Sequence, residues 1–220
     1  EFPAEISVPS DAEIFDISVR LYRGGDTAYV RIAGDHTNIV KTERNGRVLL
    51  QKPIISAEKS DRTVLNVEDI IAFADTVNVD DVRDVIGRQI EYNMAIAEEG
   101  LRGDYGANIG KTLLRSYQPD IKTTAKAYAA AGSDARMNGC ELPVVINSGS
   151  GNQGITCSVP VVVYARRLGL PEDRLYRALC VSNLVTVHLK FGIGTLSAYC
   201  GVVSAGAGAA CGITYLLGGN

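Results

Sequence analysis

The sequence predicts an α+β protein, in which a small antiparallel β-sheet region precedes a mostly α-helical domain with buried Gly/Ala-rich helices. The first observation is a change of hydrophobic period, from about two residues in residues 1–65 to about 3.6 in residues 66–220. The second is the abundance of glycine, 23 of 220 residues. The third is the stretch 191–220, which is uncharged and rich in Gly, Ala, Ser and Thr. Such helices pack closely inside a core and need no polar face.

Alternation of apolar and polar residues predicts short strands in the first region. They are expected over residues 6–8, 14–21, 27–32, 37–41 and 48–51. Gly24-Gly25-Asp26 and Arg44-Asn45-Gly46-Arg47 are turn sequences that join neighbouring strands as hairpins. The pattern therefore predicts an antiparallel sheet with one face open to water or to a helix.

Helical periodicity begins after Asn66, which is expected to cap the first helix. Helices are expected over residues 67–74, 79–100, 108–117, 120–131, 159–168, 172–190 and 196–217. Gly100 and Gly103 are expected to end the second of them. Pro171 stands at the expected start of the sixth.

Charge and cysteine usage narrow the class of protein. The net charge is −3 and the pI about 5.5, so no basic field indicates a nucleic-acid partner. The five cysteines are widely spaced and form no CxxC pair, which argues against a zinc ribbon or a thioredoxin motif. No signal peptide is visible, so a cytoplasmic location with free thiols is expected. Residues 191–220 are long enough to span a bilayer, but their small residues favour a core helix, and no membrane association is expected.

Residues 147–155 are the strongest candidate for a binding site. Glycines allow backbone N–H groups to approach a ligand, and a helix that follows adds the positive end of its dipole. The segment therefore predicts a site for a small anionic group such as a carboxylate or a phosphate. It matches a Gly-x-Gly-x-x-Gly string, but it lacks the βαβ frame of a dinucleotide site and the Lys-Ser/Thr of a P-loop. A glycine-rich turn that caps a helix is the structural alternative.

Three further residues stand out in their surroundings. Arg136 is among the last charges before the uncharged residues 142–165 and suits bidentate pairing with a substrate carboxylate; the alternative is a helix cap with a surface ion pair. Lys190 stands among apolar residues, where it either reaches solvent at a helix end or serves as a base. Cys200 lies 11 residues before Cys211. On one helix they are about 16 Å apart, so at most one of them binds a compact cluster.

Four ordered motifs resemble one family over essentially the whole chain. They are Ser133-Asp134-Ala135-Arg136-Met137, Gly149-Ser150-Gly151-Asn152-Gln153-Gly154-Ile155, Leu196-Ser197-Ala198-Tyr199-Cys200-Gly201 and Gly206-Ala207-Gly208-Ala209-Ala210-Cys211-Gly212-Ile213-Thr214. Together they are similar to the L-cysteine desulfidase / UPF0597 family, which is related to the α region of iron–sulfur L-serine dehydratases. The resemblance implies a lyase that converts L-cysteine to pyruvate, ammonia and sulfide, or L-serine to pyruvate and ammonia. It also implies a [4Fe–4S] cluster whose open iron acts as a Lewis acid.

The resemblance also assigns residues. It implies that Cys200 is a cluster ligand and that Lys190, in preference to His188, is catalytic. It implies that the substrate is bound by Ser148, Gly149, Ser150, Gly151, Asn152, Gln153 and Arg136. The family's other two cluster cysteines stand in Gly-Cys-Thr-Glu-Pro-type and Cys-Asp-Gly-Ala-Lys-type motifs, and neither string occurs here. The cluster is therefore expected in the full-length protein and is expected to be absent or incomplete in this chain.

Other interpretations stay open at this level. The chain begins without methionine and ends on a turn signal, which is expected of a fragment that is incomplete at both ends and inactive alone. A non-catalytic amino-acid-binding or scaffold protein derived from the family is the second class of function, and a small membrane-embedded helical protein is the third. The expected partner is a small-molecule amino acid, with a homodimer as a further expectation.

Overall fold

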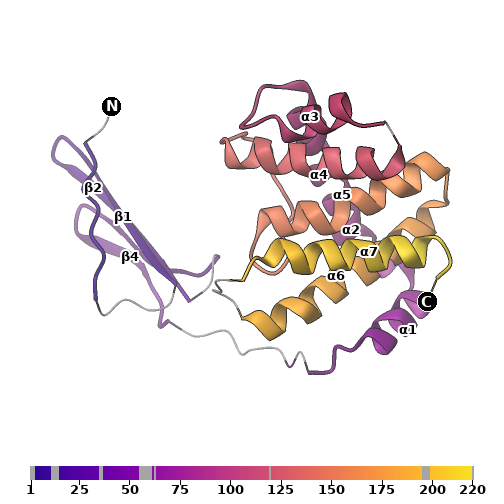
Figure 1. The fold of residues 1–220 in the computed structure, drawn as a ribbon. Helices are drawn as coiled ribbons and strands as arrows, with labels where there is room; N and C mark the ends of the chain where they lie inside the picture. Colours follow the sequence, from indigo (N-terminus) through magenta and orange to yellow (C-terminus); the bar gives the residue numbers. More distant parts are fainter. Residues whose placement is uncertain are drawn as a thin grey trace. The chain divides into compact units, whose positions relative to one another are not determined.

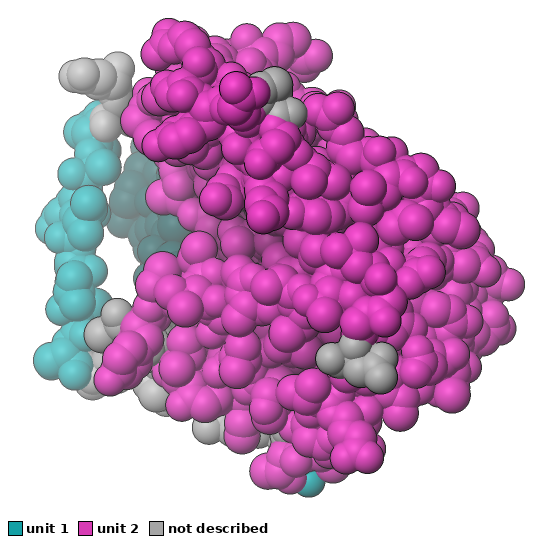
Figure 2. All heavy atoms as spheres, turned by 45° about the vertical axis from the view of Figure 1, so that its right-hand side comes forward, with its two compact units in different colours: residues 1–61 teal, residues 62–220 magenta. Residues whose placement is uncertain are grey.

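The computed structural model describes residues 3–10, 15–34, 37–54, 61, 63–118, 120–194 and 199–219. The chain divides into two compact units, residues 1–61 and residues 62–220, which Figure 2 shows in different colours. The first unit contains a four-stranded antiparallel sheet and the second is helical, as Figure 1 shows. The predicted α+β class is confirmed. Residues 196–198 of the third motif lie outside the described residues.

The sheet of the first unit is a meander in which each strand pairs with its neighbour along the chain. Its strands are β1 (Asp16–Arg23), β2 (Asp26–Ala33), β3 (Ile39–Arg44) and β4 (Arg47–Gln51). Both predicted hairpin turns are present, and Asn45 and Gly46 have the positive φ angles, 50° and 75°, that a tight hairpin turn needs. The strand predicted over residues 6–8 is wrong: Ile6 and Val8 are each 90% exposed and belong to no strand. Alternation alone does not make a strand where no partner strand buries its apolar side.

Among the described residues, the second unit contains seven helices. They are α1 (Val67–Thr76), α2 (Val79–Arg102), α3 (Ile109–Ser116), α4 (Ile121–Met137), α5 (Gly151–Leu168), α6 (Glu172–Ile193) and α7 (Gly201–Leu216). Asn66 caps α1 as predicted, because its Oδ1 accepts a hydrogen bond from the Asp69 N–H at 2.9 Å. Gly103 ends α2, but Gly100 does not: it lies inside the helix, where a Cβ would overlap the Ala131 carbonyl of α4. No helix in the described part of the chain is both long and apolar enough to cross a bilayer.

Helices α4 and α5 extend furthest beyond their predicted limits, and both differences lie beside the candidate site. Helix α4 continues to Met137 instead of ending at residue 131, so Arg136 lies in its last turn. Helix α5 begins at Gly151 instead of residue 159. Glycine is a poor helix former, and Pro160 resembles the first residue of a helix. Burial outweighs both signals here, because α5 is covered by other helices from its first turn onward.

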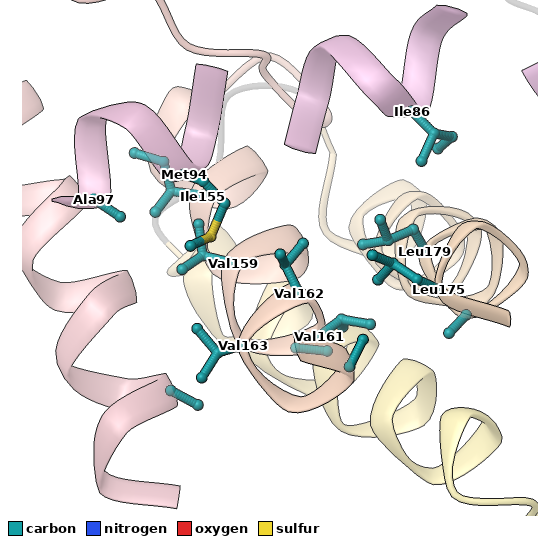
Figure 3. Packing of buried hydrophobic residues seen from close by; sticks show 14 of the residues in the cluster. Ile86, Met94, Ala97, Ile155, Val159, Val161, Val162, Val163, Leu175 and Leu179 are labelled. Atoms are coloured by element: carbon teal, nitrogen blue, oxygen red, sulfur yellow. The ribbon is translucent and has the colours of Figure 1, made fainter. Parts of the chain in front are cut away.

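Helix α5 lies at the centre of the helical unit. Its residues Ile155, Val159 and Val162 are completely buried. In Figure 3 they lie between Met94 of α2 on one side and Leu179 of α6 on the other. A helix that is apolar on all sides is stable only when neighbours cover it all round. The N-terminal end of α5 is therefore held by its core contacts as well as by its own hydrogen bonds.

Helices α6 and α7 run antiparallel and in close contact (Figure 1). Gly208 of α7 faces α6: a Cβ there would overlap Thr186 Oγ1 and would lie 2.5 Å from the Ser182 carbonyl oxygen. Gly212 faces Ala178 and Ser182 one turn further on. These small residues bring the two backbones together, as the Gly/Ala-rich composition predicts.

We expect Gly208→Ala to destabilise the protein by about 2 kcal/mol, because overpacking a close contact costs ~1–3 kcal/mol. Gly206→Ala on the same helix is the matched control, since a Cβ there meets no atom within 4 Å. Its higher helix propensity should stabilise the helix by up to ~1 kcal/mol. Urea unfolding of both variants checks this, and equal effects would contradict the packing described here.

Candidate functional site

The predicted binding segment is a tight turn followed by the first turn of α5. The N–H of Asn147 donates to the Ser150 carbonyl, and the N–H of Ser150 donates to the Asn147 carbonyl, each at 3.1 Å. Ser148 and Gly149 close the turn with φ angles of 49° and 83°. The left-handed conformation suits glycine, but for serine it is uncommon and carries strain. Residues 151–154, predicted as loop, are helical.

The N-terminal end of α5 presents unused hydrogen-bond donors. The first hydrogen bond of the helix runs from the Gly154 N–H to the Ser150 carbonyl at 3.1 Å. Within the described part of the chain, the N–H groups of Gly151, Asn152 and Gln153 have no partner. Ser150 is the N-cap residue, yet its side chain makes no capping bond. Three backbone donors and one hydroxyl at the positive end of a helix are suited to an anion.

Arg136 adds a full positive charge to this helix end. Its guanidinium lies against Gly151, where a Cβ would overlap it, and Nη1 donates to Asn152 Oδ1 at 3.3 Å. Among the described residues no acidic side chain forms an ion pair with it. The predicted alternative, a helix cap, applies instead to Asp134, whose Oδ2 accepts from the Ile109 N–H at 2.8 Å at the start of α3. Arg136 therefore has a charge that no described neighbour neutralises.

Gln153 packs the start of α5 against the start of α7. Its side chain is 5% exposed, and its Oε1 is buried without a hydrogen-bond partner in the described structure. The amide packs against Gly201, the first residue of α7, where a Cβ would overlap it. Cys200 is the N-cap residue of α7 and is exposed. An unpartnered buried amide oxygen is costly, so it indicates a place that a hydrogen-bond donor completes.

Lys190 lies in the last turn of α6 and is buried, with 7% exposure, so it does not reach solvent. Gly208 faces Thr186 and Gly212 faces Ser182, so the register of the two helices places Lys190 level with Ser204, in the first turn of α7. Cys200 caps the same end of α7. No hydrogen bond or ion pair of Lys190 is found among the described residues, and none joins it to residues 147–153.

A buried amide network supports the turn, and the sequence interpretation missed it. Asn93 of α2 is fully buried; its Oδ1 accepts from the Val145 N–H at 2.8 Å and its Nδ2 donates to the Val145 carbonyl at 3.1 Å. Gln89 of α2 bonds to Asn183 of α6, which in turn bonds to Asn147. The available signal was the position of Gln89 and Asn93 on the apolar face of α2. Polar residues on such a face require partners elsewhere in the fold.

A hollow of about 460 Å³ lies at the C-terminal end of α7, away from Cys200. It is lined by Asp75, Arg174, Arg177 and Tyr215. It contains none of the residues predicted for the site. Tyr215 and Cys200 stand at the two ends of this helix, 15 residues apart and so about 22 Å along its axis. The candidate site is therefore identified by unpartnered polar groups at a helix end, and not by the size of a cavity.

The cysteines do not converge on one centre. In the described residues, no three histidine, cysteine, aspartate or glutamate side chains come together as a metal site. Cys200 is exposed, Cys140 and Cys211 are half-buried, and Cys157 and Cys180 are buried. Burial raises the pKa of the Cys157 thiol to about 12 and also raises the pKa of Cys180. The described residues do not form an iron–sulfur site by themselves, because such clusters need several thiolates.

These environments predict the order of thiol reactivity. Cys200 should react fastest with a disulfide reagent, because reaction needs an accessible thiol that can form the thiolate. Cys157 and Cys180 should react only after unfolding. Timed labelling in native and denaturing buffer checks this, with Cys200→Ser as the variant that loses the fast phase. A fast phase that survives in Cys200→Ser would contradict the exposure described here.

Comparison with known proteins identifies relatives. The profile of the family described as "Serine dehydratase alpha chain" matches residues 27–220. The UPF0597 protein DSY1109 of Desulfitobacterium hafniense is 52% identical over 223 residues, covering 100% of this chain and 52% of the relative. A UPF0597 protein of Lachnoclostridium phytofermentans is 51% identical over 210 residues, covering 94% of this chain and 50% of the relative. The chain thus spans about half the length of these relatives. No solved structure matches it.

Proposed function

Because the chain belongs to the serine dehydratase alpha chain family, we propose that it carries the substrate site of a lyase acting on a small L-amino acid. The reaction is elimination of the β-substituent: L-serine loses water, or L-cysteine loses hydrogen sulfide. The resulting aminoacrylate is hydrolysed to pyruvate and ammonia. The observation that carries this proposal is the unpartnered N-terminal end of α5 beside the unneutralised Arg136.

The substrate carboxylate binds at this helix end. The N–H groups of residues 151–153 and the Ser150 hydroxyl donate to its oxygens, and Arg136 supplies the opposite charge. Hydrogen bonds to a charged group contribute ~1.5–3 kcal/mol each, which is enough to orient a small ligand. Residues 142–165 carry no charge of their own, so no fixed anion competes with the carboxylate.

The substrate ammonium group is placed by Gln153. Its Oε1 is a buried acceptor without a donor, and an ammonium group supplies up to three N–H donors. Together with the carboxylate donors, this acceptor distinguishes an amino acid from a simple carboxylic acid. The pairing of donors and acceptors at one helix end supports an α-amino acid as the ligand class.

Lys190 is the proposed base. Its Nζ accepts the α-proton of the substrate, the electron pair of the Cα–H bond forms the Cα–Cβ double bond, and the leaving group departs from Cβ with its bonding electrons. The proton on Nζ then passes to the departing hydroxide or hydrosulfide, which gives water or hydrogen sulfide and restores the base. Burial of Lys190 keeps bulk water from competing for this step. Proton transfer by a positioned side chain contributes about 10²- to 10⁴-fold to a rate.

Cys200 is proposed as one ligand of a cluster in the full-length protein. It is exposed at the N-terminal end of α7. Because the described residues offer no group of three ligands, the remaining ligands must come from elsewhere.

The test is pyruvate release. Full-length protein reconstituted anaerobically with iron and sulfide is expected to develop a brown chromophore and to release pyruvate from L-cysteine, L-serine or both. Ser150→Ala and Asn152→Ala should each raise KM about tenfold or more, since donors to a carboxylate are lost or displaced. Thr156→Ala, one turn further along α5, is the matched control and should leave KM unchanged. No pyruvate from either amino acid would end the lyase proposal.

A second candidate is an amino-acid-binding protein without turnover. It is favoured by one observation, that the described residues bring only one exposed thiol to the site region. Saturable binding of L-serine or L-cysteine by reconstituted protein that releases no pyruvate would select this function. Pyruvate release would eliminate it.

A further inference from the structure

The geometry points to Asn183 as a positioning residue that fixes the carboxylate-binding turn relative to Lys190. This inference rests on the proposed function, because it concerns how the binding turn and the base are aligned. Asn183 lies on α6, outside residues 147–155 and outside all four sequence motifs. It acts through Asn147, which begins the turn.

The side chain of Asn183 is held from two helices. Its Nδ2 donates to Gln89 Oε1 at 2.7 Å and to the Leu179 carbonyl at 2.9 Å. Its Oδ1 accepts from Gln89 Nε2 at 2.8 Å. The reciprocal amide pair with α2 and the bond within α6 leave Asn183 a single orientation. Its Oδ1 is thereby presented to the turn.

Asn147 is the residue of the turn that Asn183 contacts. Asn147 is 6% exposed, and its Nδ2 donates to Asn183 Oδ1 at 2.9 Å and to the Asn183 carbonyl at 3.3 Å. Its Oδ1 accepts from the Ser148 hydroxyl at 2.8 Å, and its backbone pairs with Ser150. The Asn147 side chain therefore ties the turn to α6, and the position of Ser150 and of the helix end depends on this contact.

The same helix carries the proposed base. Lys190 follows Asn183 by seven residues, so both lie on one face of α6, about 10 Å apart along its axis. Asn183 is therefore the contact through which α6 sets the distance from the carboxylate to Lys190. A displacement of ~1 Å between reacting groups costs on the order of 10²-fold in rate.

The network is neutral, so it keeps this function over a wide pH range. The Cys157 thiol shares its hydrogen between two acceptors, Asn183 Oδ1 and the Gly154 carbonyl, each 3.4 Å from Sγ. Burial raises the pKa of Cys157 to about 12, so the thiol remains a donor at physiological pH. Hydrogen bonds shielded from water are also stronger electrostatically than exposed ones.

The kinetic test uses the reconstituted full-length enzyme. Asn183→Ala is expected to lower kcat about 100-fold, to change KM much less, and to raise the kinetic isotope effect with α-deuterated substrate. Ser182→Ala is the matched control: it removes a buried hydrogen bond, 2.6 Å to the Cys157 carbonyl, from the neighbouring residue of the same helix. Ser182→Ala should affect stability alone. If Asn183→Ala behaves like Ser182→Ala, with an unchanged isotope effect, the inference is overturned.

Asn147→Ala breaks the same contact from the side of the turn. In a double-mutant cycle the Asn147→Ala and Asn183→Ala effects on kcat should be strongly non-additive, because both remove one interaction. Additive effects would contradict action through Asn147.

A readout without catalysis is hydrogen exchange of the Ser150 N–H, which should be about tenfold faster in Asn183→Ala than in Ser182→Ala. Equal exchange would overturn the inference, whereas a wild-type protein that releases no pyruvate would first overturn the proposed function.

Discussion

Replacing Lys190 by methionine is expected to lower kcat for pyruvate release about 1,000-fold, because a positioned base contributes ~10²- to 10⁴-fold to the rate. Lys190 is 7% exposed, and methionine resembles its aliphatic stem, so α6 should stay folded. KM should change little, since no hydrogen bond or ion pair joins Lys190 to residues 147–153 in the described structure. Steady-state kinetics with L-serine and L-cysteine, alongside a thermal unfolding curve, measure both parts of this expectation.

His188→Ala is the control for Lys190→Met. His188 is half-buried on the same helix and is the other titratable side chain in its last two turns. It should retain kcat within a few-fold, as surface-near substitutions usually do. A large loss of kcat in His188→Ala with a small loss of kcat in Lys190→Met would show that His188, and not Lys190, is the base.

Arg136→Ala is expected to raise KM about 100-fold, because a charge-assisted hydrogen bond of ~1.5–3 kcal/mol to the carboxylate is lost. Arg136→Lys keeps the charge but loses the planar fork, so an intermediate KM is expected. In both variants kcat at saturating substrate should fall much less than kcat/KM. The measurement is KM for the amino acid that wild-type enzyme uses.

Arg167→Ala is the matched control for Arg136. Arg167 lies in the last turn of α5, at the end opposite the candidate site, where it donates to Thr124 Oγ1 at 3.5 Å. The Arg167→Ala substitution removes the same charge from the protein and leaves the turn at residues 147–150 unchanged. If Arg167→Ala and Arg136→Ala raise KM equally, net charge explains the effect and the local role of Arg136 is wrong.

Cap residues and turn glycines made much of the fold predictable from sequence. Asn66, Gly103 and the Asn45-Gly46 turn act through contacts a few residues away, so their local sequence carries the information. The start of α5 was not predictable in this way. Gly154 is helical because its backbone packs on Val145, where a Cβ would overlap the carbonyl oxygen, and that contact depends on the tertiary fold.

The candidate site, like the fold, was only partly predictable from the sequence. Residues 147–155 stand out in the sequence because glycine and uncharged polar residues are concentrated there. For Arg136, the sequence left a surface ion pair open, whereas the structure places the guanidinium on Gly151. The contribution of Asn183 was not predictable, because its partners Gln89 and Asn147 are 94 and 36 residues away. Single polar residues on apolar helix faces indicate such a network only once the helices are placed.

The proposed function depends on binding of an amino-acid carboxylate at the N-terminal end of α5. Backbone ¹⁵N–¹H NMR titration of the chain with L-serine, and separately with L-serinamide, tests it most directly. With L-serine, saturable shifts are expected to be largest at the N–H groups of Gly151, Asn152 and Gln153, whereas L-serinamide, which lacks the carboxylate, should give small shifts there. Equal shifts with both ligands, or shifts centred on the hollow at Arg174 and Tyr215, would contradict it.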